Sequence, residues 1–351
     1  MDKVKEELKE LGYSQESIER LIKSSSLSQL KPDTLLNNIT RNYEFLLKCG
    51  DKKNEILNMT KKVPTIYIYS TENIEKKMIF MERLGYSRND ILKMTKKVPT
   101  IYNYSIENMQ TKIEDMENLG YTKKEVIKMT KKLPTIYSIN MSNINKKIED
   151  MEGLGYRKDE ILDMTKRFPE IYSYKIKSMK EKIEFMESLG YNQSQVLKMA
   201  KDLPTIYGLS KDNIKQKIEF YDSLGLHEIF VDNPQYLMQS VALSYARYMF
   251  FKEKDIEIDT SNCRRLFVGE KVFKYNYGGE KEKLLKKYNY SEYIEKKAKH
   301  ENVTSLTRAI KDVSLKDAQK GEEFLNKLEK GELMEEKDGI TIDEKWWKKQ
   351  L

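Results

Sequence analysis

Pairs of adjacent cationic residues recur along this chain at intervals of 35 residues, and a proline comes two positions after each pair. The pairs are Lys61-Lys62, Lys96-Lys97, Lys131-Lys132 and Lys166-Arg167. In the next copy Lys201 is followed by Asp202, so the pattern weakens there. Cations repeated on one face form a ladder of positive charge. Such a ladder could follow the phosphates of a nucleic acid, because each neutralised phosphate releases counterions.

The elements that must position these cations are visible in one copy, residues 120–154. Thr122 is a predicted N-cap with Glu125 as its capping-box partner, so a first helix is expected to run from there to the lysine pair. Pro134 cannot continue this helix, and a tight turn or short 3₁₀ segment should follow it. A second, longer helix is then predicted to end at Gly155, because glycine favours a helix C-terminus.

The same landmarks recur every 35 residues, which is typical of a tandem array of helical repeats. They are Pro64, Pro99, Pro134, Pro169 and Pro204, and Gly50, Gly85, Gly120, Gly155, Gly190 and Gly225. Neither helix of a unit can bury its apolar stripe alone, so neighbouring units must stack. The predicted core columns are Ile113, Ile148, Ile183 and Ile218, and Leu84, Leu119, Leu154, Leu189 and Leu224. The predicted fold is all-α, an α-solenoid (superhelix) of 35-residue helix–helix–3₁₀ repeats.

The rhythm also divides the chain of 351 residues. Residues 1–33 are predicted to form an N-terminal partial repeat or cap, and 34–232 the regular repeats. Residues 233–293 are expected to form irregular C-terminal repeats, and 294–351 a charged tail that is helical or partly disordered. This tail carries Trp346-Trp347, which either packs on the last unit or docks on another protein.

The repeated phrase resembles a known family. Leu-Gly-Tyr, a short helix, Pro-x-Ile-Tyr and a longer helix ending in Leu-Gly resemble the repeats of the mitochondrial transcription termination factor (mTERF) family, over roughly residues 35–290. The segments 233–237, 246–248 and 263–278 look like that family's irregular C-terminal units. The resemblance implies a left-handed superhelix of helix, helix and 3₁₀ triplets, with a basic groove that holds duplex DNA. Some relatives act on RNA.

The cationic residues of the first helices are the candidate nucleic-acid contacts. They comprise Lys61, Lys62, Lys93, Lys96, Lys97, Lys128, Lys131, Lys132, Lys166, Arg167 and Lys201. The alternative is that each pair only solvates a helix end and meets the negative end of its dipole. Because this column is nearly constant, it suits recognition of backbone and shape rather than of sequence.

Any sequence preference is expected from the C-terminal units. There Arg247, Arg264 and Arg265 could reach guanine edges with two hydrogen bonds each. The alternative for these arginines is salt bridging within a C-terminal cap.

Two further columns have a mainly structural interpretation. The lysines of the longer helix have acidic neighbours, which favours a self-neutralised, solvated face; they are Lys77, Lys112, Lys147, Lys182 and Lys217. Tyrosines recur after the Pro-x-Ile and Leu-Gly positions, where a ring would seal the joint between helices. Stacking on unpaired bases is the alternative for the tyrosines.

Nothing in the sequence favours catalysis. His227 and His300 are the only histidines, and no Cys or His cluster has metal-ligand spacing, so we expect neither an enzyme nor a cofactor or metal. Cys49 and Cys263 give no disulfide framework. No apolar run approaches the roughly 18 residues that span a membrane. Residues 1–30 mix acidic and basic side chains, unlike an import presequence, so a cytoplasmic, non-organellar or bacterial-type family member is expected.

Three functions follow as hypotheses. The first is a non-enzymatic binder of double-stranded DNA that regulates or terminates transcription. The second is a binder of structured RNA, for example in ribosome assembly, that uses the same groove. The third is a protein–protein interaction scaffold, a general use of solenoid surfaces. The array has no inherent need to dimerise, so a monomer is expected, and the charged tail is a candidate for contact with a protein partner.

Overall fold

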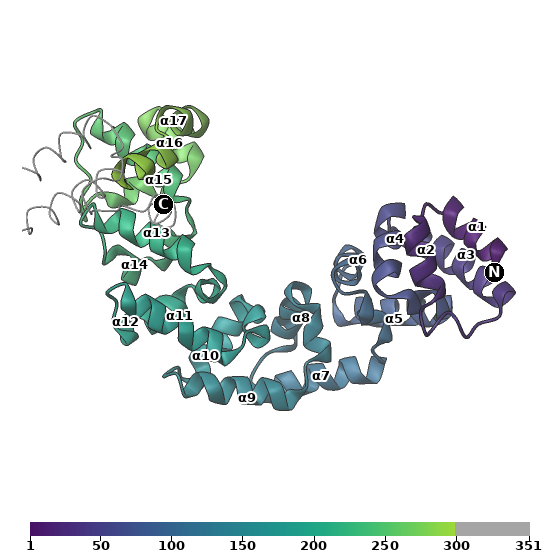
Figure 1. Ribbon diagram of the computed structural model, residues 1–351. Coiled ribbons are helices and arrows are strands. Elements are labelled where there is room, and N and C mark those ends of the chain that lie inside the picture. Colours follow the sequence, from purple (N-terminus) through teal and green to yellow (C-terminus); the bar gives the residue numbers. More distant parts are fainter. Residues whose placement is uncertain (299–351) are drawn as a thin grey trace, which may run out of the picture. The chain divides into compact units, whose positions relative to one another are not determined.

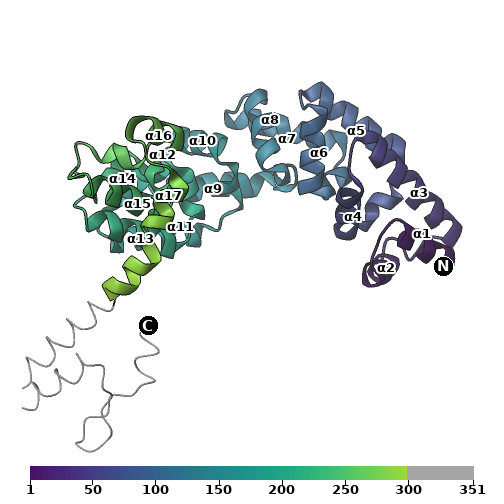
Figure 2. The ribbon, with the colours of Figure 1, turned by 90° about the horizontal axis from the view of Figure 1, so that it is seen from above.

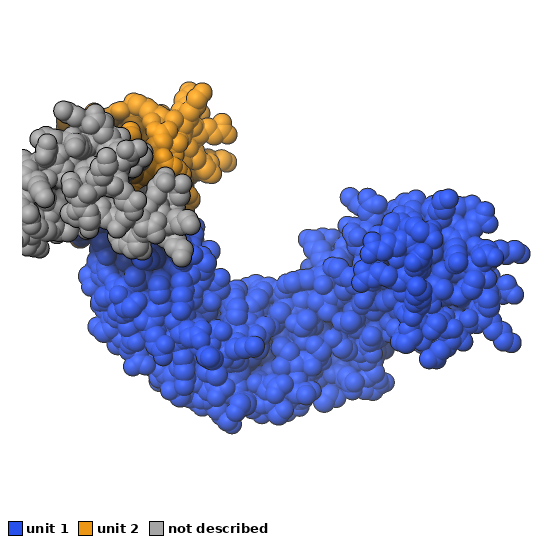
Figure 3. Space-filling view, viewed as in Figure 1, with its two compact units in different colours: residues 1–238 blue, residues 239–351 orange. Residues whose placement is uncertain are grey.

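The computed structural model describes residues 1–298, which form α-helices and short 3₁₀ helices without a strand in this range. The chain divides into two units, Met1–Met238 and the residues from Gln239 onward (Figure 3). In the first unit the helices follow one another in chain order from α1 to α14 (Figures 1 and 2). The all-α repeat fold predicted from the sequence is confirmed. The predicted tail, apart from 294–298, lies outside the described residues.

The first unit begins with a partial repeat. Its helices α1 (Asp2–Glu10) and α2 (Gln15–Ile22) precede the long helix α3 (Pro32–Cys49), against which α1 packs. Ser14 is the N-cap of α2 and accepts a hydrogen bond from the Ser17 amide. The segment therefore starts the array with the same helix-start chemistry that the later repeats use.

The regular triplets then repeat five times, each with a first α-helix, a 3₁₀ helix and a second α-helix. They are α4 (Lys53–Lys62), η1 (Pro64–Ile68) and α5 (Thr71–Leu84); α6 (Arg88–Lys97), η2 (Pro99–Asn103) and α7 (Ile106–Leu119); α8 (Lys123–Lys132), η3 (Pro134–Ser138) and α9 (Met141–Glu152); α10 (Lys158–Arg167), η4 (Pro169–Ser173) and α11 (Ile176–Ser188); and α12 (Gln193–Asp202), η5 (Pro204–Gly208) and α13 (Lys211–Asp222). A shortened triplet begins with α14 (Ile229–Asp232) and η6 (Pro234–Met238).

The local causes of these triplets are those that the sequence predicts. Thr122 and Glu125 form a complete capping box at the start of α8. Pro134 opens η3 directly after α8 ends. Gly120, at the C-terminus of α7, has φ of 114°, a left-handed conformation that a side chain would strain. Each helix thus starts and stops for a reason encoded in its own unit.

The core between units is formed by repeated apolar columns. The isoleucine column that includes Ile113 and Ile148 is buried, as predicted. The prediction for the leucine column is wrong in most copies, because only Leu154 is buried and the others are intermediate. Methionines such as Met116 and Met151 fill the innermost positions, with no exposed surface at all. Flexible, unbranched methionine adapts well to the gap between stacked helices.

The second unit contains α15 (Val241–Lys252), η7 (Cys263–Leu266), α16 (Glu270–Tyr277) and α17 (Lys281–Lys287). Helix α15 packs against both η7 and α17. Phe251 and Phe273 are almost fully buried, and their ring centroids lie 5.6 Å apart, so this unit has its own aromatic core. The boundary between the two units falls after Met238.

Candidate nucleic-acid interface

The first helices of the repeats form one row and the second helices another. In Figure 1, α4, α6 and α8 lie in one row, with α5, α7 and α9 in the other. The first row is continued by backbone contacts of α4 with α6, of α8 with α10 and of α10 with α12. Between α6 and α8 it is continued by the ion pair of Asp90 with Lys131. Each row therefore presents a surface built from the same position of successive repeats.

The two rows differ in charge. Helix α8 carries five lysines and one glutamate, whereas α7 carries four acidic residues and one lysine. The lysine of α7, Lys112, is itself only 8% exposed. The cationic character of the first row is concentrated in α4, α6 and α8, because α10 carries three basic and three acidic residues. A polyanion would therefore be attracted to α8 and repelled from α7, whereas α5, α11 and α13 carry equal numbers of acidic and basic residues.

Four predicted contact residues on this row are exposed and have no hydrogen bond or ion pair to another described residue. They are Lys61, Lys62, Lys93 and Lys128. One of them lies over an aromatic ring: Nζ of Lys61 is 5.8 Å from the centroid of the Tyr13 ring. These ammonium groups keep their full charge available for an external anion.

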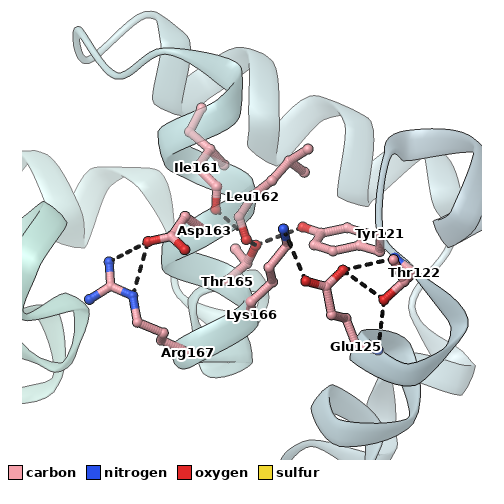
Figure 4. Close-up of polar contacts among 9 residues, drawn as sticks. All are labelled: Tyr121, Thr122, Glu125, Ile161, Leu162, Asp163, Thr165, Lys166 and Arg167. Carbon is pink, nitrogen blue, oxygen red and sulfur yellow. Dashed lines mark hydrogen bonds and ion pairs between the residues drawn. The ribbon is translucent and has the colours of Figure 1, made fainter.

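The first cation of each later pair contacts an acidic residue of the preceding unit instead. Nζ of Lys166 lies 3.2 Å from a carboxylate oxygen of Glu125 (Figure 4). The equivalent pairs are Lys96–Glu55 at 2.8 Å, Lys131–Asp90 at 2.7 Å and Lys201–Glu160 at 3.2 Å. Lys61 lacks such a partner because Ser17 occupies the corresponding capping position of α2. These cations therefore link consecutive units as well as facing solvent.

The acidic partner in each link is the third residue of a helix, which also caps that helix. The carboxylate of Glu125 accepts a hydrogen bond from the Thr122 amide at 2.8 Å in addition to the contact with Lys166. The Thr122 amide and Lys166 hold the pKa of Glu125 below its usual range. Lys131 and Ser87 lower the pKa of Asp90 to about 2. The carboxylates therefore remain charged at neutral pH.

The second cation of each later pair reaches forward to the next unit. Nζ of Lys132 donates to the carbonyl oxygen of Arg167 at 2.8 Å, and Arg167 donates to the carbonyl of Asp202 at 2.9 Å. Lys97 makes the equivalent bond to the carbonyl of Lys132. Arg167 also pairs with Asp163 one turn earlier, as Figure 4 shows. These side chains satisfy carbonyls at the end of the next first helix, which otherwise lack partners.

The lysine column of the second helices is not a solvated face, so that prediction is wrong. Lys112, Lys147, Lys182 and Lys217 are at most 9% exposed. Nζ of Lys112 donates to the carbonyl oxygen of Ile139, directly after the 3₁₀ helix η3 of the next unit, at 2.5 Å. Burial lowers the pKa of each of these lysines. The acidic neighbours of these lysines suggested a solvated face. In the structure each ammonium group instead donates to a backbone carbonyl at or just after a 3₁₀ helix.

The tyrosine columns meet across the joints. The hydroxyl of Tyr121 lies 2.5 Å from that of Tyr172 and 2.6 Å from the hydroxyl of Thr165. Figure 4 shows Tyr121 directed at Thr165, which also donates to the carbonyl of Ile161 at 2.8 Å. The rings of Tyr121 and Tyr172 are buried, so they seal a joint and present no face for base stacking. Packing, rather than base recognition, is their role in this structure.

The three arginines of the second unit have different surroundings. Arg247 is only 2% exposed and donates to the carbonyl oxygens of Leu266 and Val268 at 2.8 and 2.7 Å. Its guanidinium lies 4.4 Å from the centroid of the Phe273 ring. The prediction that Arg247 contacts a guanine edge is therefore wrong, because the Arg247 guanidinium is enclosed in the core of the second unit. Arg264 is exposed and Arg265 is half-buried, both in η7.

Within residues 1–298 no cluster of histidine, cysteine and acidic side chains could hold a metal ion. None of the helices in the same range is both long and apolar enough to cross a membrane. Cys49 and Cys263 are free, and burial raises the pKa of both thiols.

The comparisons with known proteins agree with the repeat geometry. The mTERF family model matches residues 1–149, 69–189 and 112–274, so the overlapping matches span most of the chain. No curated protein matches the sequence significantly. Members of the matched family generally bind nucleic acids and act in the regulation of transcription or translation. The chain belongs to the mTERF family.

Proposed function

We propose that this protein is a non-enzymatic, monomeric nucleic-acid-binding protein that holds double-stranded DNA along the row formed by α4, α6 and α8, and regulates or terminates transcription. The observation that carries the proposal is the contrast between five lysines on α8 and four acidic residues on α7. Family membership supports the same class of ligand. We further propose that it acts in the cytoplasm.

The exposed cations supply most of the binding energy in this proposal. Lys62, Lys93 and Lys128 carry charges that no described acidic residue neutralises. A duplex places one phosphate charge about every 1.7 Å along its axis, so a row of such groups can neutralise several phosphates at once. Each contact releases counterions, which makes the affinity steeply dependent on salt concentration.

The paired cations belong to the same surface but contribute less. Lys96, Lys131 and Lys166 each share their charge with a carboxylate, although about a third of each side chain remains exposed. A phosphate that approaches them also meets that carboxylate, which reduces the net attraction. We therefore expect these residues to position the row of helices as much as they attract the ligand.

Recognition in this row concerns the phosphate backbone rather than base sequence. The end of the first helix reads Met-Thr-Lys-Lys in α4, α6 and α8 alike, so successive units present the same groups. A code that reads one base per unit needs side chains that differ between units. Exposed Arg264 in the second unit remains a candidate for contact with a base edge.

The test is a binding titration of the full chain with random duplex DNA and with structured RNA at two salt concentrations. The interface variant changes Lys61, Lys62, Lys93 and Lys128 to Gln. Its matched control changes four exposed lysines of the second helices, Lys76, Lys146, Lys180 and Lys215, to Gln, which removes the same total charge. The interface variant should lose most of its affinity. Its plot of log K against log salt concentration should become shallower by about 3.6, which is about 0.9 for each of the four lost phosphate contacts. The control should bind almost as the unchanged protein does.

Equal losses in the two variants would show that net charge, not the first-helix row, governs binding, and would contradict the proposed surface. Absence of binding to both polymers at low salt would contradict a nucleic-acid function and favour a protein-binding scaffold. Tighter binding to RNA than to DNA at matched salt would keep the surface but reverse the choice of ligand.

A further inference from the structure

The joint between α3–α4 and α6–η2 lacks the tyrosine that follows the glycine in neighbouring joints. In four joints this tyrosine contacts a second tyrosine, as described for Tyr121 and Tyr172; the pairs are Tyr13–Tyr67, Tyr86–Tyr137, Tyr121–Tyr172 and Tyr156–Tyr207. In a fifth joint Tyr191 follows Gly190, and its hydroxyl donates to the carbonyl oxygen of His227 at 2.9 Å instead. After Gly50 the residue is Asp51. Asp51 thus stands between α3 and α4 where the other joints hold a phenol ring.

The aspartate at this position is buried, and its carboxylate oxygens lack hydrogen-bond partners. Asp51 is 3% exposed, and neither of its carboxylate oxygens has a hydrogen bond to a described residue. The hydroxyl of Tyr102, which would meet the missing tyrosine, is also buried, and Thr95 of its own unit is the one hydrogen-bonding side chain beside it among the described residues. An aspartate is several atoms shorter than a tyrosine, so it cannot reach across the joint. Unpaired buried polar groups of this kind weaken a packed interface.

The charges around Asp51 do not compensate for its burial. The titratable groups facing it from the packed elements are Cys49 from α3, Glu55 from α4, Arg88 and Lys96 from α6, and Tyr102 from η2. Nζ of Lys96 lies 3.8 Å from the Asp51 carboxylate but 2.8 Å from that of Glu55. Lys96 is therefore shared, and Glu55 has the better geometry. Burial raises the pKa of Asp51 to about 6, against the opposing effect of Lys96.

We propose that the joint between α3–α4 and α6–η2 is a built-in hinge of the first unit, which opens more readily when Asp51 is ionised. Protonation lets the buried carboxyl donate a hydrogen bond and removes the cost of an enclosed charge. Because the pKa of Asp51 is higher in the folded state than its usual 3.8, the joint is firmest at low pH. This stabilisation is lost as the pH rises to about 6, so the joint is loosest at neutral pH.

The position of the hinge gives it a consequence for binding. It lies between α4, which carries Lys61 and Lys62, and α6, which carries Lys93. Opening of this hinge would change the distance between the cations of α4 and those of α6. The row formed by α4, α6 and α8 could then follow a curved phosphate backbone. This consequence rests on the proposed function, whereas the hinge itself does not.

Hydrogen exchange of the full chain, measured without nucleic acid, tests the hinge independently of binding. The amides of α6 and η2 are compared with the equivalent amides of α8 and η3, after correction for intrinsic exchange rates. At pH 7 the α6–η2 amides should exchange at least about tenfold faster, because the ionised carboxylate favours the open joint. Changing Asp51 to Tyr should supply the missing ring and remove this difference. Equal protection of the two joints in the unchanged protein would overturn the proposal.

Two further variants separate charge from shape. Asp51→Asn removes the charge but keeps the gap, so its α6–η2 amides should be better protected than those of the unchanged protein at pH 7 and about equally protected at pH 4. Tyr121→Asp places the same residue at the α8–α10 joint, where it should create a second pH-dependent opening. If Asp51→Asn shows the same exchange as the unchanged protein at both pH values, the ionised carboxylate is not the cause and the proposal fails.

Discussion

The hydroxyl of Tyr121 lies 2.5 Å from the hydroxyl of Tyr172, which is 51 positions later in the chain. Tyr121 lies just before α8, Tyr172 lies in η4 of the next repeat unit, and both rings are buried. A contact of this kind joins one unit to the next and cannot form within a single unit. The energetics of the array therefore depend on such interfaces as well as on the helices themselves.

The first prediction concerns this pair. Changing Tyr172 to Phe should lower the free energy of unfolding by about 1 kcal/mol, because one buried hydrogen bond is lost while the ring remains. Tyr121→Phe should cost more, since the Tyr121 hydroxyl contacts both Tyr172 and Thr165. The double variant should cost less than the sum of the two, because the residues share one interaction. Urea unfolding of the three variants measures these differences, and strictly additive losses would contradict the direct contact.

The second prediction concerns the buried lysines. Lys182→Met should lower the free energy of unfolding of the first unit by about 1–3 kcal/mol. The reason is that the half-buried carbonyl of Leu209 loses the hydrogen bond that Nζ of Lys182 donates to it. Lys180→Met, two positions earlier and exposed, is the matched control and should change stability by less than about 0.5 kcal/mol. Thermal or urea unfolding provides the comparison.

The same lysine predicts a pH dependence. The pKa of Lys182 is lower in the folded state than its usual 10.5, because burial disfavours the charged form. The unfolded chain therefore binds more protons in the alkaline range below 10.5, so the contribution of Lys182 to stability grows as the pH rises there. The difference between the unchanged protein and Lys182→Met should widen from neutral to alkaline pH. A difference that narrows instead would contradict the direction of the pKa shift.

The third prediction separates the two roles of Glu125. Glu125→Gln keeps a side-chain oxygen for the Thr122 amide but removes the charge that faces Lys166. It should cost about 0.2–1 kcal/mol, the usual range for a partly exposed ion pair. Glu125→Ala removes the cap as well and should cost about 1 kcal/mol more. A double-mutant cycle with Lys166→Gln measures the coupling, which should shrink at high salt. A coupling that is unaffected by salt would show that the interaction is not ionic.

The fourth prediction concerns the core of the second unit. Arg247→Met should lower the stability of the unit by about 3 kcal/mol, because two buried carbonyls lose a charged donor. Arg264→Met in η7 is the exposed control and should have little effect. Hydrogen exchange of residues 239–298 reports on this unit separately from the first. Equal effects of the two substitutions would contradict the structural role assigned to Arg247.

Much of the fold follows from signals that lie within one repeat. Thr122 with Glu125 and Pro134 mark where the first helix starts and stops, and the structure confirms both. The predicted end of the second helix at Gly155 is wrong, because α9 already ends at Glu152 and Gly155 takes its left-handed conformation in the turn that follows. Such signals are local, because capping and backbone restrictions act over a few residues. The nucleic-acid role of the lysine ladder remains a prediction.

Other features could not be assigned from the local pattern. Lys147 and Glu149 looked like members of one solvated face, yet Lys147 is buried against a carbonyl of the next unit. Arg247 looked available for a base, yet its partners come from residues 266 and 268. The partner of Lys166 was detectable in principle, because an acidic residue recurs 41 positions before the first lysine of each later pair.

The sequence by itself determined the repeat, its two helices and 3₁₀ turn, and the apolar stripe that forces units to stack, because these depend on interactions between residues close in the chain. Only the tertiary structure decided which cations remain exposed and which join units, since that depends on the groups that stacking brings within reach. Lys62 and Lys97 occupy the same repeat position, but only Lys97 has a recorded bond to the next unit within the described residues. A side chain's charge is fixed by its type, whereas its availability to a ligand depends on competition from neighbouring units.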